Sequence, residues 1–135
     1  MSATVIIPTT GSPELLDAVD SVLSQTYNTV CYVVVDGRQN SNKVKLLLTT
    51  RLSGNIQVAY LPENVGANGF YGHRVYAAFT HLINTEYVFY LDQDNWYENN
   101  HVESCVKTIE DLGLDWCYSL RNVYTKNSQF ICQDN

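Results

Sequence analysis

Two carboxylates separated by one residue stand directly after an apolar run. Asp92 and Asp94 follow residues 87–91, which are apolar or aromatic and typical of a buried strand. Two carboxylates at the end of such a strand lose solvation and repel each other. A divalent cation relieves both costs, because hard cations prefer oxygen ligands and can also hold a diphosphate. The pattern therefore predicts a divalent-cation site at Asp92 and Asp94, with a solvated turn as the alternative.

The elements that would position these acids follow from the periodicity of apolar residues. Apolar runs predict strands and helical spacing predicts helices, in the order strand 4–8, helix 12–25, strand 32–36, helix 43–51, strand 56–60, helix 73–83, strand 87–91, helix 99–112, strand 115–120 and edge strand 130–132. The alternative end of the strand that starts at residue 115 is Tyr124. Ser12 is the expected cap of the first helix. This alternation predicts an α/β fold with a mostly parallel central sheet and helices on both faces.

Polar residues follow three of the predicted strands. Thr9 and Thr10 follow the first, Asp36 ends the second, and Asp92 begins the acidic pair. Because open α/β sheets bind ligands at the carboxyl ends of their strands, we expect these side chains to meet at one edge. The loop 62–72 is rich in glycine and asparagine, but no Lys-Ser or Lys-Thr follows it, so it is no P-loop.

Composition narrows the class of protein. The chain has 135 residues, 45% of them hydrophobic, which suits a single domain spanning 1–135. A net charge of −6 argues against a nucleic-acid partner, which requires a basic face. No run is long enough to span a membrane, and a cytoplasmic protein is expected. The four widely spaced cysteines are expected to be reduced thiols, with neither a zinc site nor a disulfide.

The order and spacing of several motifs resemble a known family. They are Val5-Ile-Ile-Pro-Thr9, Ser21-Val-Leu-Ser-Gln-Thr-Tyr27, Val33-Val-Val-Asp-Gly37, Glu63-Asn-Val-Gly66, Arg74 and Leu91-Asp-Gln-Asp94. Together they resemble the family 2 glycosyltransferases of the GT-A fold, also called the nucleotide-diphospho-sugar transferase fold. The resemblance extends from residue 3 to about residue 112.

The resemblance implies a role for each matching residue. Asp94 is the chief metal ligand, Asp92 faces the metal or the ribose, and Arg74 approaches the diphosphate. The alternative for Arg74 is a surface ion pair. The remaining nucleotide-binding candidates are Pro8, Thr9, Thr10, Asp36, Asn64, Gly66 and Gln93, with a simple turn as the alternative for Asn64 and Gly66.

The activity that the resemblance implies is metal-dependent transfer of a hexose with inversion, with Mn²⁺ or Mg²⁺ as the expected cation. A UDP-sugar is the favoured donor, a GDP- or dTDP-sugar is the alternative, and the acceptor is unknown. Two rival functions are a non-catalytic nucleotide-sugar binding module and, less favoured, a nucleotidyltransferase. The latter needs a basic loop near the N-terminus, and residues 8–11 contain no Lys or Arg.

The chain departs from the family pattern in two places. Asp36 is followed by Gly37, where members often carry a second acid. Few residues follow Asp94, so we expect most of the acceptor-binding region to be lacking and transfer to be weak. Asp134 is then the candidate catalytic base. A homo-oligomer is a further expectation, since a neighbouring subunit would supply the missing part of the acceptor-binding region.

Overall fold

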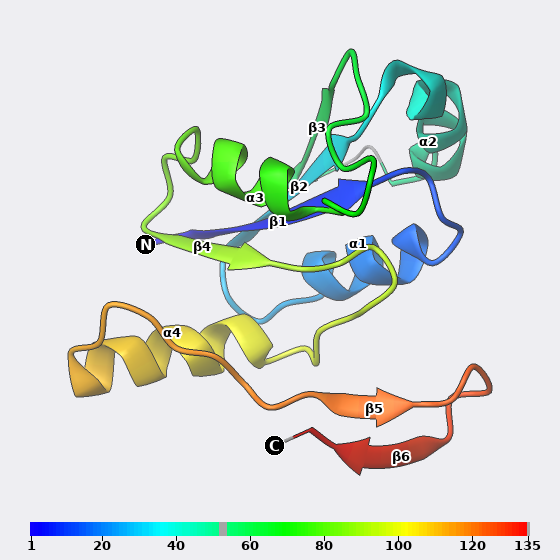
Figure 1. The fold of residues 1–135 in the computed structure, drawn as a ribbon. Helices are drawn as coiled ribbons and strands as arrows, with labels where there is room; N and C mark the ends of the chain where they lie inside the picture. The colour runs from blue at the N-terminus through cyan, green and yellow to red at the C-terminus, as the bar shows by residue number, and fades with distance from the viewer. Residues whose placement is uncertain (52–53, 135) are drawn as a thin grey trace. The chain divides into compact units, whose positions relative to one another are not determined.

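The computed structural model describes residues 1–51 and 54–134 (Figure 1). The chain forms two compact units, Met1–Glu103 and Ser104–Asn135, and each is described by itself. Whether they constitute a single domain stays a prediction.

A four-stranded sheet organises the first unit. Its strand order is β3 (Ile56–Tyr60), β2 (Thr29–Val35), β1 (Ala3–Thr9) and β4 (Tyr87–Tyr90). Each of the three neighbouring pairs is parallel. The predicted mostly parallel sheet is therefore confirmed, and the four strands of the first unit start close to their predicted positions.

The two central strands are apolar on both faces, which explains why they read as continuous hydrophobic runs. All seven residues of β1 are buried, and five of the seven in β2 are buried. The edge strand β4 differs, because β1 is its only partner among the described residues. The prediction of a buried strand at 87–91 holds for Leu91, which is buried, but was wrong for Tyr90, which is 49% exposed.

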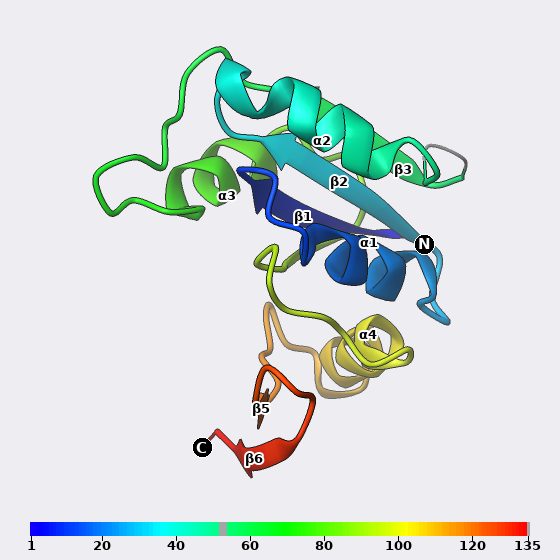
Figure 2. The same cartoon turned by 90° about the vertical axis from the view of Figure 1, so that its right-hand side faces the viewer.

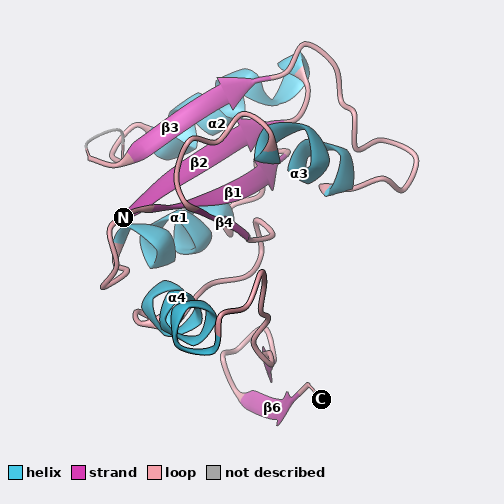
Figure 3. Cartoon of the chain, turned by 90° about the vertical axis from the view of Figure 1, so that its left-hand side faces the viewer, coloured by secondary structure: helices cyan, strands magenta, loops and turns pink. Residues whose placement is uncertain are grey.

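Helices cover both faces of this sheet, as predicted (Figures 2 and 3). Helix α3 (His73–Thr80) lies on one face, where its Val75 and Phe79 pack with Ile6 and Val34. Helices α1 (Leu15–Leu23) and α2 (Ser41–Leu48) lie on the other face, towards which alternate residues of β1 and β2 point. The buried residues of these two helices are Leu15, Ala18, Val19, Ser21, Val22, Val44 and Leu48.

The start of α1 differs from the prediction. The N-cap residue is Glu14, and no side chain caps the helix. The Ser12 hydroxyl instead donates a hydrogen bond to the Glu14 carboxylate, while the Ser12 carbonyl accepts one from the Leu15 N–H. A short turn, η1 (Arg38–Asn40), precedes α2 in the same unit.

The second unit contains most of α4 (His101–Leu112) and a hairpin of β5 (Asn122–Tyr124) and β6 (Phe130–Gln133). The edge strand predicted at 130–132 is confirmed as part of β6. The core strand predicted at 115–120 was wrong, because those residues form no strand and Trp116 and Tyr118 are exposed. Of the alternative that ends at Tyr124, only residues 122–124 form a strand, which is β5. The rings of Trp116 and Tyr118 stack on each other at 6.1 Å between centroids, and no strand among the described residues pairs with this segment.

Candidate functional site

The polar residues predicted to meet at one sheet edge do lie there. The Asp36 N–H donates to the Thr9 carbonyl at 2.8 Å, so the ends of β1 and β2 are adjacent. The Leu91 N–H donates to the Ile6 carbonyl at 3.1 Å, which continues the pairing of β4 with β1 up to the acidic pair. Parallel pairing therefore brings three sequence-distant loops to the carboxyl edge of the sheet.

Asp36 anchors the loop that follows β3. Its carboxylate is 3% exposed and accepts hydrogen bonds from the backbone N–H groups of Val65, at 2.7 Å, and Gly66, at 2.8 Å. These charge-assisted bonds offset the desolvation of the carboxylate. A Cβ at residue 66 would overlap the Tyr71 carbonyl and lie 2.7 Å from the Asp36 carboxylate, so only glycine fits.

Gln93, which lies between the two acids of the pair, joins its loop to the loop after β1. Its side-chain oxygen accepts hydrogen bonds from the Thr9 hydroxyl at 2.6 Å, the Thr10 N–H at 3.2 Å and the Ser12 N–H at 3.3 Å. Three donors from residues 9–12 therefore bind one amide oxygen that lies more than eighty residues further along the chain.

Asp92 is held by a tyrosine that the sequence reasoning missed. The Tyr76 hydroxyl, from α3, donates to one carboxylate oxygen of Asp92 at 2.7 Å. Burial, and then the hydrogen bond and charge of Asp92, raise the pKa of Tyr76 far above its usual value, so the phenol keeps its proton even where a free tyrosine ionises. Its ring lies edge-on to that of Tyr90 at 5.0 Å. Nothing in the local sequence signals this contact, because it joins two separate elements.

Arg74 and Pro8 make contacts that place them beside the same loops. The Arg74 guanidinium donates to the Val65 carbonyl at 3.2 Å and lies 3.4 Å from the centroid of the Phe70 ring. These contacts replace the surface ion pair considered as its alternative. Pro8 lies against Gly72 at the start of α3, where a Cβ on the glycine would be 2.9 Å from the proline ring.

Asn64 carries a buried acceptor next to the Asp36 anchor. Its side-chain oxygen has no hydrogen-bond partner within the described residues. A buried polar group of this kind costs free energy unless water or a ligand satisfies it. The structure therefore makes Asn64 a residue with unused hydrogen-bonding capacity at this edge.

The donor set of Asp92 and Asp94 suits a cation that arrives with phosphate groups. Both side chains are exposed, and the described residues contain no cluster of three or more His, Cys, Asp or Glu residues suited to a metal ion. Mg²⁺ commonly binds through one or two carboxylates plus substrate phosphates rather than in a cage made only of protein ligands. The two carboxylates fit that mode.

Asp134, the predicted base, belongs to the second unit. Its carboxylate accepts hydrogen bonds from the Arg121 guanidinium, and its N–H donates to the Arg121 carbonyl at 2.7 Å. Arg121 and Asp134 therefore form an ion pair beside the hairpin.

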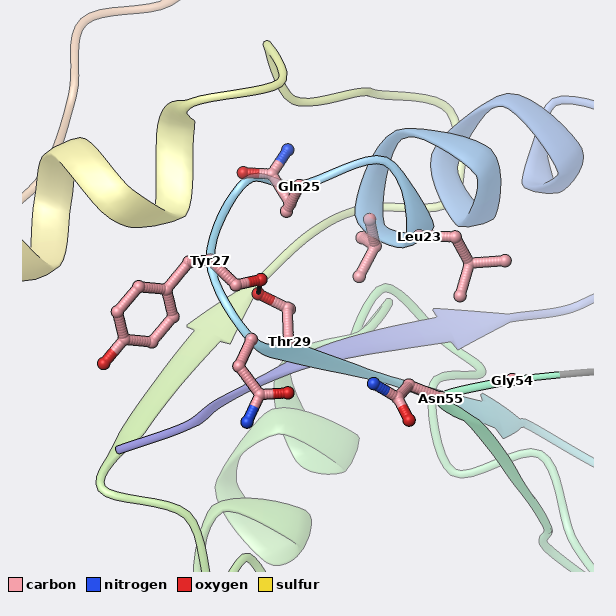
Figure 4. A pocket seen from close by; sticks show the side chains of 8 residues that line it. Leu23, Gln25, Tyr27, Thr29, Gly54 and Asn55 are labelled. Carbon is pink, nitrogen blue, oxygen red and sulfur yellow. Dashed lines mark hydrogen bonds between the residues drawn. The ribbon is translucent and has the colours of Figure 1, made fainter.

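A pocket of about 380 Å³ lies at the opposite edge of the sheet (Figure 4). Thr29 and Asn55, at the amino ends of β2 and β3, line it together with Gln25 and Tyr27. Because ligands of open α/β sheets bind at the carboxyl ends of strands, this pocket is not the candidate site.

Comparison with known proteins decides the family. The model of the family described as "Glycosyl transferase family 2" matches residues 4–131. The chain belongs to this family. Among curated proteins no match was found. Of the family's predicted features, the α/β fold with its parallel sheet is thus confirmed, whereas the roles of the individual site residues stay predictions.

A solved structure of another protein has the same fold as the present chain. A mannosyltransferase from Pyrobaculum calidifontis, in complex with GDP-Man and Mn²⁺, matches with a TM-score of 0.61 and 21% identity. The match covers 79% of the present chain and 32% of the mannosyltransferase chain, so the present chain spans about a third of that protein. The fold is the GT-A fold. No helix among the described residues is long and apolar enough to cross a membrane.

Proposed function

We propose that the protein is a glycosyltransferase that binds a nucleotide-diphosphate sugar with Mn²⁺ or Mg²⁺. The observation that carries this proposal is the meeting of Thr9, Asp36 and the Asp92–Asp94 pair at the carboxyl edge of a GT-A sheet. Membership of glycosyl transferase family 2 supports the same class of reaction.

Each residue has a role in this proposal. Asp94 and Asp92 hold the cation, and Arg74 faces the diphosphate from the first turn of α3. Thr9, Thr10 and the loop around Asn64 and Gly66, which Asp36 fixes, surround the base and ribose. When bound, the cation neutralises charge on the leaving diphosphate.

The proposed reaction is a single displacement with inversion at the anomeric carbon. A hydroxyl oxygen of the acceptor forms a bond to that carbon as the bond from the carbon to the phosphate oxygen breaks. The nucleoside diphosphate leaves with the bonding electrons, and the hydroxyl proton passes to a base. Asp134 is the candidate base, and Arg121 binds one of its two carboxylate oxygens, Oδ2.

The donor is proposed to be a UDP-hexose, with a GDP-hexose next. The second choice gains support from the mannosyltransferase of the same fold, whose solved complex contains GDP-Man. A dTDP-sugar completes the set of donors to be tested. The cytoplasmic location and homo-oligomeric state also belong to this proposal and rest on the sequence alone.

A binding experiment tests the nucleotide and metal parts. Thermal shifts with UDP-, GDP- and dTDP-sugars, each with and without Mn²⁺, identify the donor, and calorimetry then measures its affinity. Asp94→Ala is expected to abolish the Mn²⁺-dependent binding while the melting temperature holds or rises, because repulsion from Asp92 is relieved. Asp115→Ala, a change at another exposed acid, serves as the control. Unchanged affinity in Asp94→Ala would refute the metal site.

Release of nucleoside diphosphate separates an enzyme from a binding module. Release that depends on an added acceptor supports glycosyl transfer, whereas tight binding of the donor without release supports the non-catalytic alternative. The solution mass should be measured in the same samples, because a neighbouring subunit can complete an acceptor site.

A further inference from the structure

Gln93 makes the densest set of side-chain hydrogen bonds between the loops of the candidate site. Its oxygen accepts from the Thr9 hydroxyl, the Thr10 N–H and the Ser12 N–H, at 2.6–3.3 Å. Its side-chain nitrogen also lies 3.4 Å from the Thr10 hydroxyl. The Thr9 hydroxyl in turn accepts from the Gly11 N–H at 2.9 Å, so residues 9–12 are all tied to one amide group.

The chemistry of this position suits an amide better than any other side chain. An aliphatic residue of the same length accepts no hydrogen bond. A carboxylate accepts all of them but adds a third negative charge between Asp92 and Asp94, which repel it. Glutamine thus supplies an oxygen acceptor without charge, and that oxygen is used inside the protein rather than offered to a ligand.

We propose that Gln93 is a positioning residue that fixes the loop after β1 against the loop carrying Asp92 and Asp94. This inference rests on the proposed function, in which the first loop contacts the base and ribose and the second contacts the cation and diphosphate. A ligand that touches both loops benefits from their fixed separation, as a bivalent ligand does from a matched linker. A ligand that touches only one loop gains nothing from it.

Binding of three ligands, followed by ¹H–¹⁵N spectra and calorimetry, distinguishes a ligand that contacts both loops from one that contacts a single loop. Uridine tests the base loop alone, Mg²⁺ with pyrophosphate tests the acidic loop alone, and Mg²⁺ with UDP tests both. If the thermal-shift panel selects a GDP-sugar, guanosine and GDP replace the uridine compounds. The variant is Gln93→Met, which keeps the length of the side chain and removes the strong acceptor.

The positioning role of Gln93 predicts that the substitution weakens the three ligands unequally. In Gln93→Met, Mg²⁺-UDP binding is expected to weaken about tenfold, equivalent to about 1.4 kcal/mol. Uridine and Mg²⁺-pyrophosphate are expected to bind within about threefold of the wild-type affinities. In the wild type, Mg²⁺-pyrophosphate is expected to shift the amide resonances of Thr10 and Ser12 through Gln93, and this shift should vanish in the variant.

Two further variants keep the result interpretable. Gln93→Glu retains the oxygen acceptor but adds a negative charge beside Asp92 and Asp94. It is therefore expected to restore only part of the affinity for Mg²⁺-UDP, relative to uridine and Mg²⁺-pyrophosphate, that Gln93→Met loses. Gln57→Met, at an exposed position on β3, is the control and should change no affinity. Thermal melts of all variants show that they fold, and the exposed or half-buried backbone donors at Thr10 and Ser12 can turn to water.

Other outcomes overturn the proposal. Equal weakening of uridine or of Mg²⁺-pyrophosphate in Gln93→Met would make Gln93 a direct ligand. Unchanged Mg²⁺-UDP binding would show that the hydrogen bonds have no role in recognition, although the proposed function would stand. Failure of the wild type to bind any nucleoside diphosphate with either Mn²⁺ or Mg²⁺ would refute the proposed function itself, and the positioning role of Gln93 with it.

Discussion

Replacing Asp36 by asparagine is expected to loosen the loop at residues 64–66 and destabilise the protein strongly. The wild-type carboxylate is 3% exposed and accepts two backbone hydrogen bonds, at 2.7 and 2.8 Å. Hydrogen bonds to a buried charge contribute about 1.5–3 kcal/mol each. Asparagine keeps one neutral acceptor and turns an N–H₂ group towards the other backbone N–H. The net loss is therefore about 3 kcal/mol, or roughly 10 °C in melting temperature for a chain of this size.

Urea unfolding and hydrogen exchange measure this effect. Asp36→Asn should lower the free energy of unfolding by the stated amount and remove the protection of the Val65 and Gly66 amides. Asp115→Asn, at an exposed site, should change stability by less than about 0.5 kcal/mol. A variant as stable as the wild type that no longer binds nucleotide would refute this reasoning, because the carboxylate would then act on the ligand rather than on the loop.

Three further substitutions test single contacts of the site and the core. Gly66→Ala should lower the free energy of unfolding in urea by about 1–3 kcal/mol, because its Cβ overlaps a backbone carbonyl. Gly69→Asn, in open space, should lower it by under about 1 kcal/mol, and equal losses would refute the packing argument. Tyr76→Phe should weaken Mg²⁺-dependent nucleotide binding about fivefold in calorimetry, since Asp92 loses one hydrogen bond; unchanged affinity would show that the carboxylate needs no support. Burial raises the pKa of the Cys31 thiol to about 12, so the folded state holds this proton more tightly than the unfolded chain does. Stability should therefore be unaffected by this thiol below about pH 8.5 and fall as the pH rises from there towards 12, a trend that Cys31→Ala should reduce in melts at each pH.

The sequence by itself determined the fold class and the edge at which the site lies. The apolar periodicities of strands and helices are local features of the sequence. Because β1 and β2 are buried on both faces, each is a continuous apolar run that can be recognised without knowing its neighbouring strands. The polar residues after these strands then lie together because parallel strands share their carboxyl edge. Local pattern failed at 115–120, where an aromatic run resembles a strand but is exposed and pairs with no strand in the described part of the chain.

Only the tertiary structure shows which groups the individual site residues contact, and their roles in binding stay predictions. The prediction from the sequence that Asp36 and Gln93 bind the nucleotide stays a prediction. The structure adds that side-chain oxygens of both residues accept hydrogen bonds from backbone N–H groups of other loops. Tyr76 escaped notice because its partner, Asp92, is sixteen residues away on another element. A hydrogen bond depends on which donor lies within about 3 Å in space, and residue type and local spacing carry no information about that distance.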